Sequence, residues 1–125
     1  MKIIAVLLFT AFNGYAQSVR CSYVVKTIGY SYDSMVGNYR ETVTSIDRVK
    51  LCQGPETIAI GAKTTFHLGD AIEEVKSKKG KTFRLHATNE KYQPLILEMW
   101  YPDDAGAQMY VKATYSEYFI VYFLE

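Results

Sequence analysis

The stretch that decides the fold covers residues 82–101 and reads TFRLHATNEKYQPLILEMWY. Two segments in which apolar and polar residues alternate flank the turn-forming residues Asn89-Glu90-Lys91, which is the pattern of a β-hairpin that buries one face. Folding the chain at this turn places the apolar residues of both strands on one face: Phe83, Leu85, Ala87, Leu95, Leu97 and Met99. The sequence therefore predicts an antiparallel hairpin.

A second turn extends this hairpin into a meander. The segment Pro102-Asp103-Asp104-Ala105-Gly106 is rich in turn-forming residues, and a further alternating segment follows at 107–115. Folding the chain about Asp104 adds three residues to the same apolar face: Met109, Val111 and Ala113. One continuous apolar face is what a correct register should produce. In this register we expect Trp100 to pair with Gln108.

The rest of the chain repeats this organisation, with short alternating segments about every ten residues. Residues 70–79 are ambiguous, because Asp70 and Glu73 resemble a helix start and Gly80 a helix end, whereas the apolar stripe is short. A hairpin with its turn at Lys79-Gly80 continues the meander and is favoured over a short helix. We predict an all-β fold, an antiparallel meander that forms a small barrel or sandwich.

The N-terminus has the features of a secretory signal peptide. Residues 3–12 are almost entirely apolar, and small residues ending at Ala16 precede Gln17. The apolar run is too short for a membrane-spanning helix, which needs about twenty residues. We expect residues 1–16 to be removed, leaving 17–125 as a single β domain that is secreted or periplasmic.

The only two cysteines, Cys21 and Cys52, are expected to form a disulfide, because an exported protein folds in an oxidising compartment. If residues 19–33 and 40–53 fold back on each other around the Val36–Gly37 midpoint, these cysteines lie directly opposite each other. The same register pairs three further sets of residues: Lys26 with Asp47, Asp33 with Arg40, and Val24 with Val49. A bulge that shifts this register, or two buried free thiols, are the alternatives.

Composition and motifs argue against catalysis and against an electrostatic partner. Of the 125 residues, 49% are hydrophobic and 22% charged, as in globular domains. Removing Lys2 with the leader leaves 13 basic and 13 acidic side chains, a balance that does not favour nucleic acid or an anionic membrane. The two histidines lack the further ligands of a zinc site, and no nucleophile motif is present. We therefore expect no enzyme, no metal and no cofactor.

One surface stands out by its composition. If the chain turns tightly at 115–118, the outer faces of the last strands gather five apolar residues: Trp100, Tyr110, Phe119, Val121 and Phe123. In this pairing Tyr110 lies opposite Phe123, and Thr114 lies near Phe119. Aromatic residues are enriched where surfaces become buried on binding, so this face is a candidate contact site for a partner. The alternative is that these residues form the second half of the core.

Several segments resemble those of small, uncharacterised exported β proteins of Gram-negative bacteria. The resemblance rests on Gly14-Tyr15-Ala16-Gln17, Gly29-Tyr30-Ser31-Tyr32, Thr57-Ile58-Ala59-Ile60 and the ending at 118–123. It implies export and β structure, but no activity and no site residues.

The function expected from the sequence is that of a non-enzymatic binding module, which contacts a protein through an aromatic strand face or a sheet edge. The alternative is a small barrel that carries an apolar ligand. A ligand cavity needs small inward residues, whereas Leu97 and Met99 are large enough to fill the interior. The module is therefore favoured over the carrier.

Overall fold

The computed structural model describes residues 19–104 and 106–125, which fold into nine strands. The expected leader at 1–16, with its cleavage site, lies outside the described residues. The strands and their bounds are β1 (Arg20–Asp33), β2 (Asn38–Ser45), β3 (Val49–Gln53), β4 (Thr57–Ile60), β5 (Thr64–Lys76), β6 (Gly80–Thr88), β7 (Pro94–Pro102), β8 (Tyr110–Thr114) and β9 (Tyr118–Leu124).

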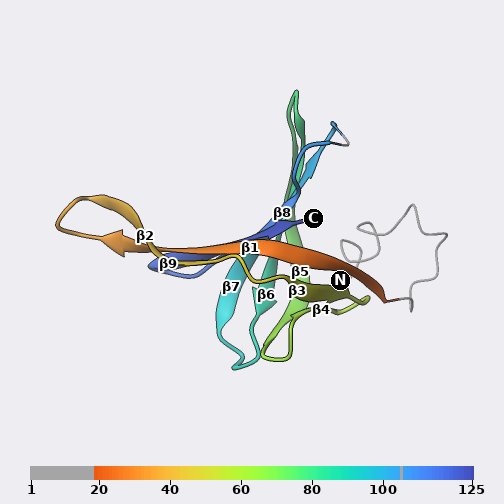
Figure 1. The fold of residues 1–125 in the computed structure, drawn as a ribbon, viewed down its shortest axis with the longest axis horizontal. Coiled ribbons are helices and arrows are strands. Elements are labelled where there is room, and N and C mark those ends of the chain that lie inside the picture. The colour runs from red at the N-terminus through yellow and green to blue at the C-terminus, as the bar shows by residue number, and fades with distance from the viewer. Residues whose placement is uncertain (1–18, 105) are drawn as a thin grey trace.

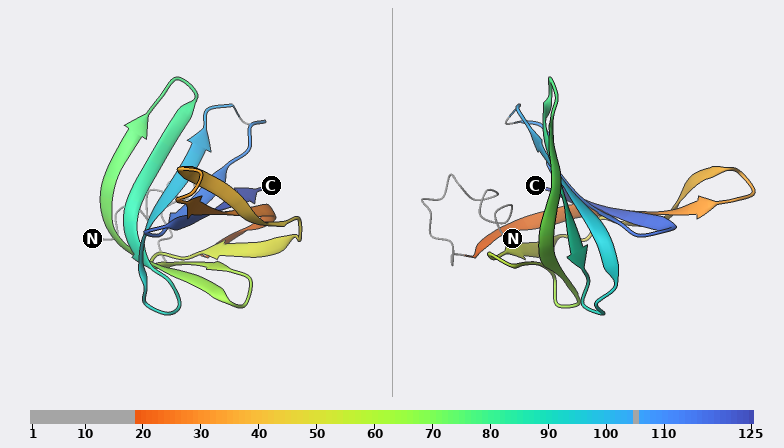
Figure 2. Two further views of the ribbon diagram at one scale, coloured as in Figure 1. Left: turned by 90° about the vertical axis from the view of Figure 1, so that its left-hand side faces the viewer. Right: turned by 180° about the vertical axis from the view of Figure 1, so that it is seen from behind.

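Eight of these strands close into an antiparallel barrel. From β3 to β9 each strand pairs with the next along the chain, as in a meander. Closure depends on β1, which pairs with β3 through residues 20–24 and with β9 through residues 24–31. The ninth strand, β2, pairs only with the end of β1, and the two strands project from the barrel as a hairpin (Figures 1 and 2). The predicted all-β class and the barrel alternative are confirmed.

The core lies inside the barrel, where alternate residues of each strand meet. Leu85, Leu97 and Ala113 are fully buried, as the apolar face predicted. The register between β6 and β7 is the predicted one, with Leu85 opposite Leu97. Between β7 and β8 the predicted face is correct but the register is displaced by two residues, because the connection is longer than the turn at Asp104 implied. Trp100 consequently pairs with Tyr110 and not with Gln108.

The N-terminal strands show both a confirmed prediction and a correction. Cys21 lies opposite Cys52 and is disulfide-bonded to it, and Val24 lies opposite Val49. Beyond this point the bulge alternative holds. Thr27 lies opposite Ser45, already one residue off the predicted register, and a bulge at Gly29/Tyr30 adds a second residue, so that Asp33 lies opposite Asn38 and not opposite Arg40.

The predicted pairing of Lys26 with Asp47 is also wrong. Residues 46–48 lie outside the strands, between β2 and β3, so Asp47 is not part of the ladder. Lys26 instead lies opposite Phe123 of β9.

Residues 70–79 form a hairpin and not a helix. β5 continues to Lys76 and β6 begins at Gly80, with Ser77 N–H donating to the Gly80 carbonyl at 2.8 Å. Gly80 is buried against β7, where a β-carbon would lie 2.2 Å from the Tyr101 carbonyl oxygen. The glycine thus allows the two backbones to approach closely at this point, and the short-helix alternative is wrong.

Among the residues that the structure describes, none belongs to a helix that could cross a membrane.

Candidate functional site

The β1–β2 hairpin projects from the barrel into solvent, and we call residues 30–45 the arm. Every residue of β2 is exposed except Ser45, which is half-buried. The edge of β2 that faces away from β1 pairs with no strand of the described chain. Apolar side chains also point into solvent, since Met35 is 95% exposed and Val36 and Val43 are each 62% exposed. Figure 1 shows the arm reaching well beyond the barrel wall.

The turn at the tip is ordered by the side chain of Asp33. Its Oδ1 accepts a hydrogen bond from the Met35 N–H at 3.0 Å, and its Oδ2 pairs with Arg40 Nη1 at 3.0 Å. The hydrogen bond from Arg40 and that from Met35 lower the pKa of Asp33. Gly37 adopts a φ of 76°, a left-handed conformation that favours glycine. Local interactions therefore hold the tip in shape without a core beneath it.

Aromatic rings join the arm to the barrel wall, and we call them the root cluster: Tyr30, Tyr32, Tyr39 and Phe119. Tyr30 stacks on Phe119 with ring centroids 4.7 Å apart, and Tyr39 meets Phe119 edge-on at 5.1 Å. Tyr32 packs edge-on against Tyr39 at 5.5 Å. Tyr32 and Tyr39 remain 49% and 42% exposed, so the cluster offers ring surface to a partner while fixing the arm's base.

A second aromatic group lies on the outer face of β7, β8 and β9, and we call it the wall cluster: Trp100, Tyr110 and Phe123. Trp100 stacks on Tyr110 at 6.4 Å, and Tyr110 meets Phe123 at 6.2 Å. Burial raises the pKa of Tyr110, and the nearby Glu98 carboxylate adds to the effect. All three rings are half-buried, because each is covered by its neighbours on the same face.

The five residues predicted as a contact face lie on the outer faces of β7, β8 and β9, where their rings fall into two clusters. Three of them make up the wall cluster, whereas Phe119 belongs to the root cluster. Val121 lies between the two clusters opposite Ile28 and is only 8% exposed. The predicted pairings of Tyr110 with Phe123 and of Thr114 with Phe119 are confirmed.

β1 adds to this face residues that were not among the five predicted. Tyr30 and Ile28 reach Phe119 and Val121 because β1 closes the barrel against β9. The available signal was the alternation of Lys26, Ile28 and Tyr30, but nothing in the sequence named β9 as their partner.

Comparisons of this chain with protein-family models, with curated proteins and with solved structures gave no match. A function for this chain has to be derived from its own geometry.

Several charged groups of the described residues form ion pairs at the surface. Arg84 contacts Glu73 at 2.8 Å and Glu98 at 3.2 Å across β5, β6 and β7. Arg48 makes a two-pronged contact with Glu125 at 3.1 and 3.0 Å and stacks over Tyr23. Within residues 19–104 and 106–125 no three His, Cys, Asp or Glu side chains come together as a metal site would require. The arm and the two ring clusters offer apolar contact surface and, along β2, backbone hydrogen-bonding groups.

Proposed function

We propose that this chain is an exported, non-enzymatic binding module whose arm binds an extended segment of a protein partner. The observation that carries the proposal is the free edge of β2, whose backbone donors and acceptors lie on a strand exposed along its length. An extended peptide can add to such an edge as a further strand, with its main chain supplying the hydrogen bonds.

The composition of the arm supports a protein as the occupant. Exposed edge strands invite unwanted pairing, and proteins usually protect them with proline, short length, charged side chains or a bulge. β2 carries Arg40, Glu41 and the bulge, but it has eight residues and no proline. The tip adds the exposed Met35 and Val36. Keeping these apolar groups in water carries a cost that burial against a partner would remove.

The side chains of the root cluster support the same proposal. Tyrosine provides a large contact area at a small entropic cost, and it is enriched among the residues that dominate binding energy. Tyr32 and Tyr39 are already fixed by ring contacts, so little freedom remains to be lost when a partner covers them.

Export is part of the proposal, because the disulfide fits an oxidising compartment outside the cytoplasm. The features of residues 1–16 point the same way. A periplasmic or secreted location would give the arm access to exported partners.

The test is site-specific crosslinking in the cells that produce the protein. A photoreactive residue at Val43, on the exposed strand β2, should give one defined crosslinked product with a partner protein. The double variant Met35→Ser/Val36→Ser should lose that product, because it removes the apolar tip but leaves the fold intact.

The matched control is Ile72→Ser/Val75→Ser, which removes two exposed apolar residues from the β5–β6 hairpin. This control should crosslink like the wild type. The proposal is wrong if no product forms at Val43, or if the two double variants affect the product equally.

A further inference from the structure

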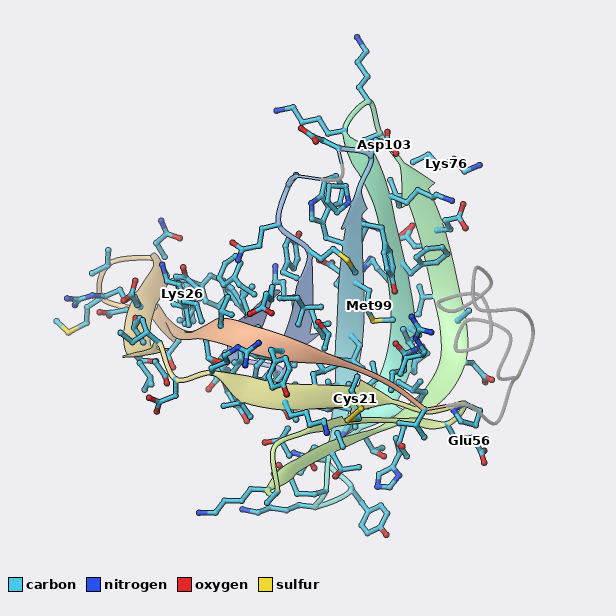
Figure 3. All side chains as sticks on the ribbon, turned by 45° about the vertical axis from the view of Figure 1, so that its right-hand side comes forward. Cys21, Lys26, Glu56, Lys76, Met99 and Asp103 are labelled. Carbon is cyan, nitrogen blue, oxygen red and sulfur yellow. A yellow bond between two sulfur atoms is a disulfide. The ribbon has the colours of Figure 1, made fainter. Side chains whose placement is uncertain are left out.

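One end of the barrel opens into a cavity of about 310 Å³. It lies where the start of β1 and β8 and the end of β3, β7 and β9 meet, and most of its wall is apolar. The apolar lining comes from Leu51, Ile58, Met99, Met109, Val111 and Leu124. Figure 3 shows Met99 on the inner side of the barrel, with the Cys21–Cys52 bridge nearby. The large residues that we expected to fill the interior fill its middle but leave this end open.

A buried amide group faces this apolar cavity. Gln53, the last residue of β3, lies on the same face of the strand as the buried Leu51, and only 7% of it is exposed. Its Nε2 has no hydrogen-bond partner among the described residues. An amide donor buried without an acceptor is costly, by about 1–3 kcal/mol. The wall of the cavity thus holds a buried donor that has no acceptor among the described residues.

The remaining polar groups at the cavity favour a neutral ligand. The Tyr101 phenol is uncharged at neutral pH, and burial raises its pKa further above the ordinary value. The Glu125 carboxylate at the mouth is held by Arg48. Arg20 also lies at the mouth, and its charge is opposite to that of Glu125. No net charge in the cavity selects an ion.

The volume sets the size of the ligand. Ligand sites begin at about 300 Å³, and a dry cavity of about 150 Å³ is sufficient for benzene. Twice that space accommodates a molecule of roughly ten to twelve non-hydrogen atoms. The two methionines can adapt their side chains to its outline, since thioethers are flexible and polarisable.

We propose that this cavity binds a small neutral molecule with an apolar body and one carbonyl oxygen. The oxygen accepts a hydrogen bond from Gln53 Nε2, and the body packs against Met99, Met109 and Leu124. This binding site is separate from the arm and does not depend on the function proposed for it. It gives the ligand-carrier alternative a defined site and a ligand class.

Two probes of similar size test the proposal on the mature protein: 2-nonanone, which carries a carbonyl, and naphthalene, which carries no oxygen. Heteronuclear NMR of isotope-labelled protein reports the side-chain amide of Gln53 directly. Both probes should shift the resonances of residues that line the cavity, and only 2-nonanone should strongly shift the Gln53 side-chain amide. Gln53→Leu should weaken 2-nonanone about five- to tenfold, through the lost hydrogen bond, without weakening naphthalene.

Two further variants make the test specific. Met109→Trp should fill the mouth of the cavity and abolish binding of both probes; if its spectrum is not that of a folded protein, Val111→Phe serves the same purpose. The arm variant Met35→Ser/Val36→Ser should bind both probes like the wild type, which separates this site from the proposed function.

Two results would overturn the inference. If neither probe shifts the cavity resonances at saturating concentration, the cavity holds water only. If Gln53→Leu binds 2-nonanone as tightly as the wild type, the amide does not recognise the carbonyl.

Discussion

The barrel wall β6–β9 and the arm are both antiparallel β structure, yet they are stabilised in different ways. In the wall, alternate residues such as Leu85 and Leu97 are fully buried, whereas β2 of the arm has no buried residue. The wall is held by the burial of apolar area, and the arm by a turn, by ring stacking at its root and by one ladder with β1.

This difference shows where the chain keeps apolar side chains exposed to water. A strand that buries nothing contributes little to the free energy of unfolding, and it opens more readily than the core. Apolar side chains on such a strand do not serve the fold. The proposed function accordingly assigns binding to the arm and leaves the barrel as its scaffold.

The largest predicted effect contrasts the two regions directly. Leu97→Ala removes a fully buried side chain from the centre of the wall and should lower the free energy of unfolding by about 3–5 kcal/mol. Val43→Ala, on the exposed arm, should change it by less than about 0.5 kcal/mol. Urea unfolding followed by tryptophan fluorescence measures both. Equal effects would mean that the arm belongs to the cooperative core.

The disulfide gives the next largest effect, because it ties the start of β1 to β3, at the end of β1 that lies away from the arm. The bridge joins residues 31 apart, and the loop that it closes contains the entire arm. The double variant Cys21→Ala/Cys52→Ala should lose about 3 kcal/mol of stability, mainly because the unfolded chain gains freedom.

Thermal unfolding with and without reductant checks this prediction. The reduced wild-type protein should unfold at nearly the same temperature as the double variant. A double variant as stable as the oxidised wild type would contradict a stabilising role for the bridge.

The same contrast explains what the sequence could predict. In the wall, the buried face forces one register, since a slip by one residue would expose Leu85 and Leu97. The pairing of β6 with β7 was predictable for that reason. The predicted register of β8 was wrong by two residues. Both registers bury the same face, so the apolar pattern could not distinguish between them.

In the arm no buried face constrains the register. The spacing of Val43, Ile46 and Val49 hints at a bulge, but its position at Gly29/Tyr30 could not be read from the alternation, because the β2 partners of these residues are exposed. Barrel closure between β1 and β9 joins segments from opposite ends of the chain, and no local signal specifies that contact. The cavity escaped prediction for the same reason: Gln53 looked like the polar end of a strand, and its burial depends on strands from both halves of the chain.

Gly80 provides a third, smaller test within the wall. A methyl group there would meet the Tyr101 carbonyl oxygen and the Pro102 Cα, so Gly80→Ala should lower the free energy of unfolding by about 1–3 kcal/mol. Gly54→Ala is the matched control, because its added methyl would lie 3.9 Å from the nearest side chains. Urea unfolding of the two variants should separate them clearly. If they are equally stable, β6 and β7 can move apart at this point without cost.

The smallest predicted effect is a local pH dependence at the tip of the arm. Arg40 and the Met35 N–H lower the pKa of Asp33 below the ordinary value of 3.8. A carboxylate whose pKa is lower in the folded state stabilises the fold above its unfolded pKa, and this contribution is lost as the pH falls through the folded value. The tip should therefore keep its structure at neutral pH and loosen only below pH 3.8, while the barrel, which does not contain this carboxylate, stays folded.

The Met35 amide reports this change, because it donates to Asp33 Oδ1. Its NMR shift should titrate with a midpoint below 3.8 in the wild type, and closer to 3.8 in Arg40→Gln, since the hydrogen bond from Arg40 is the largest cause of the shift. In Asp33→Asn the titration should disappear. A wild-type midpoint at or above 3.8 would show that Asp33 does not hold the tip, and the arm would then be ordered from its aromatic root alone.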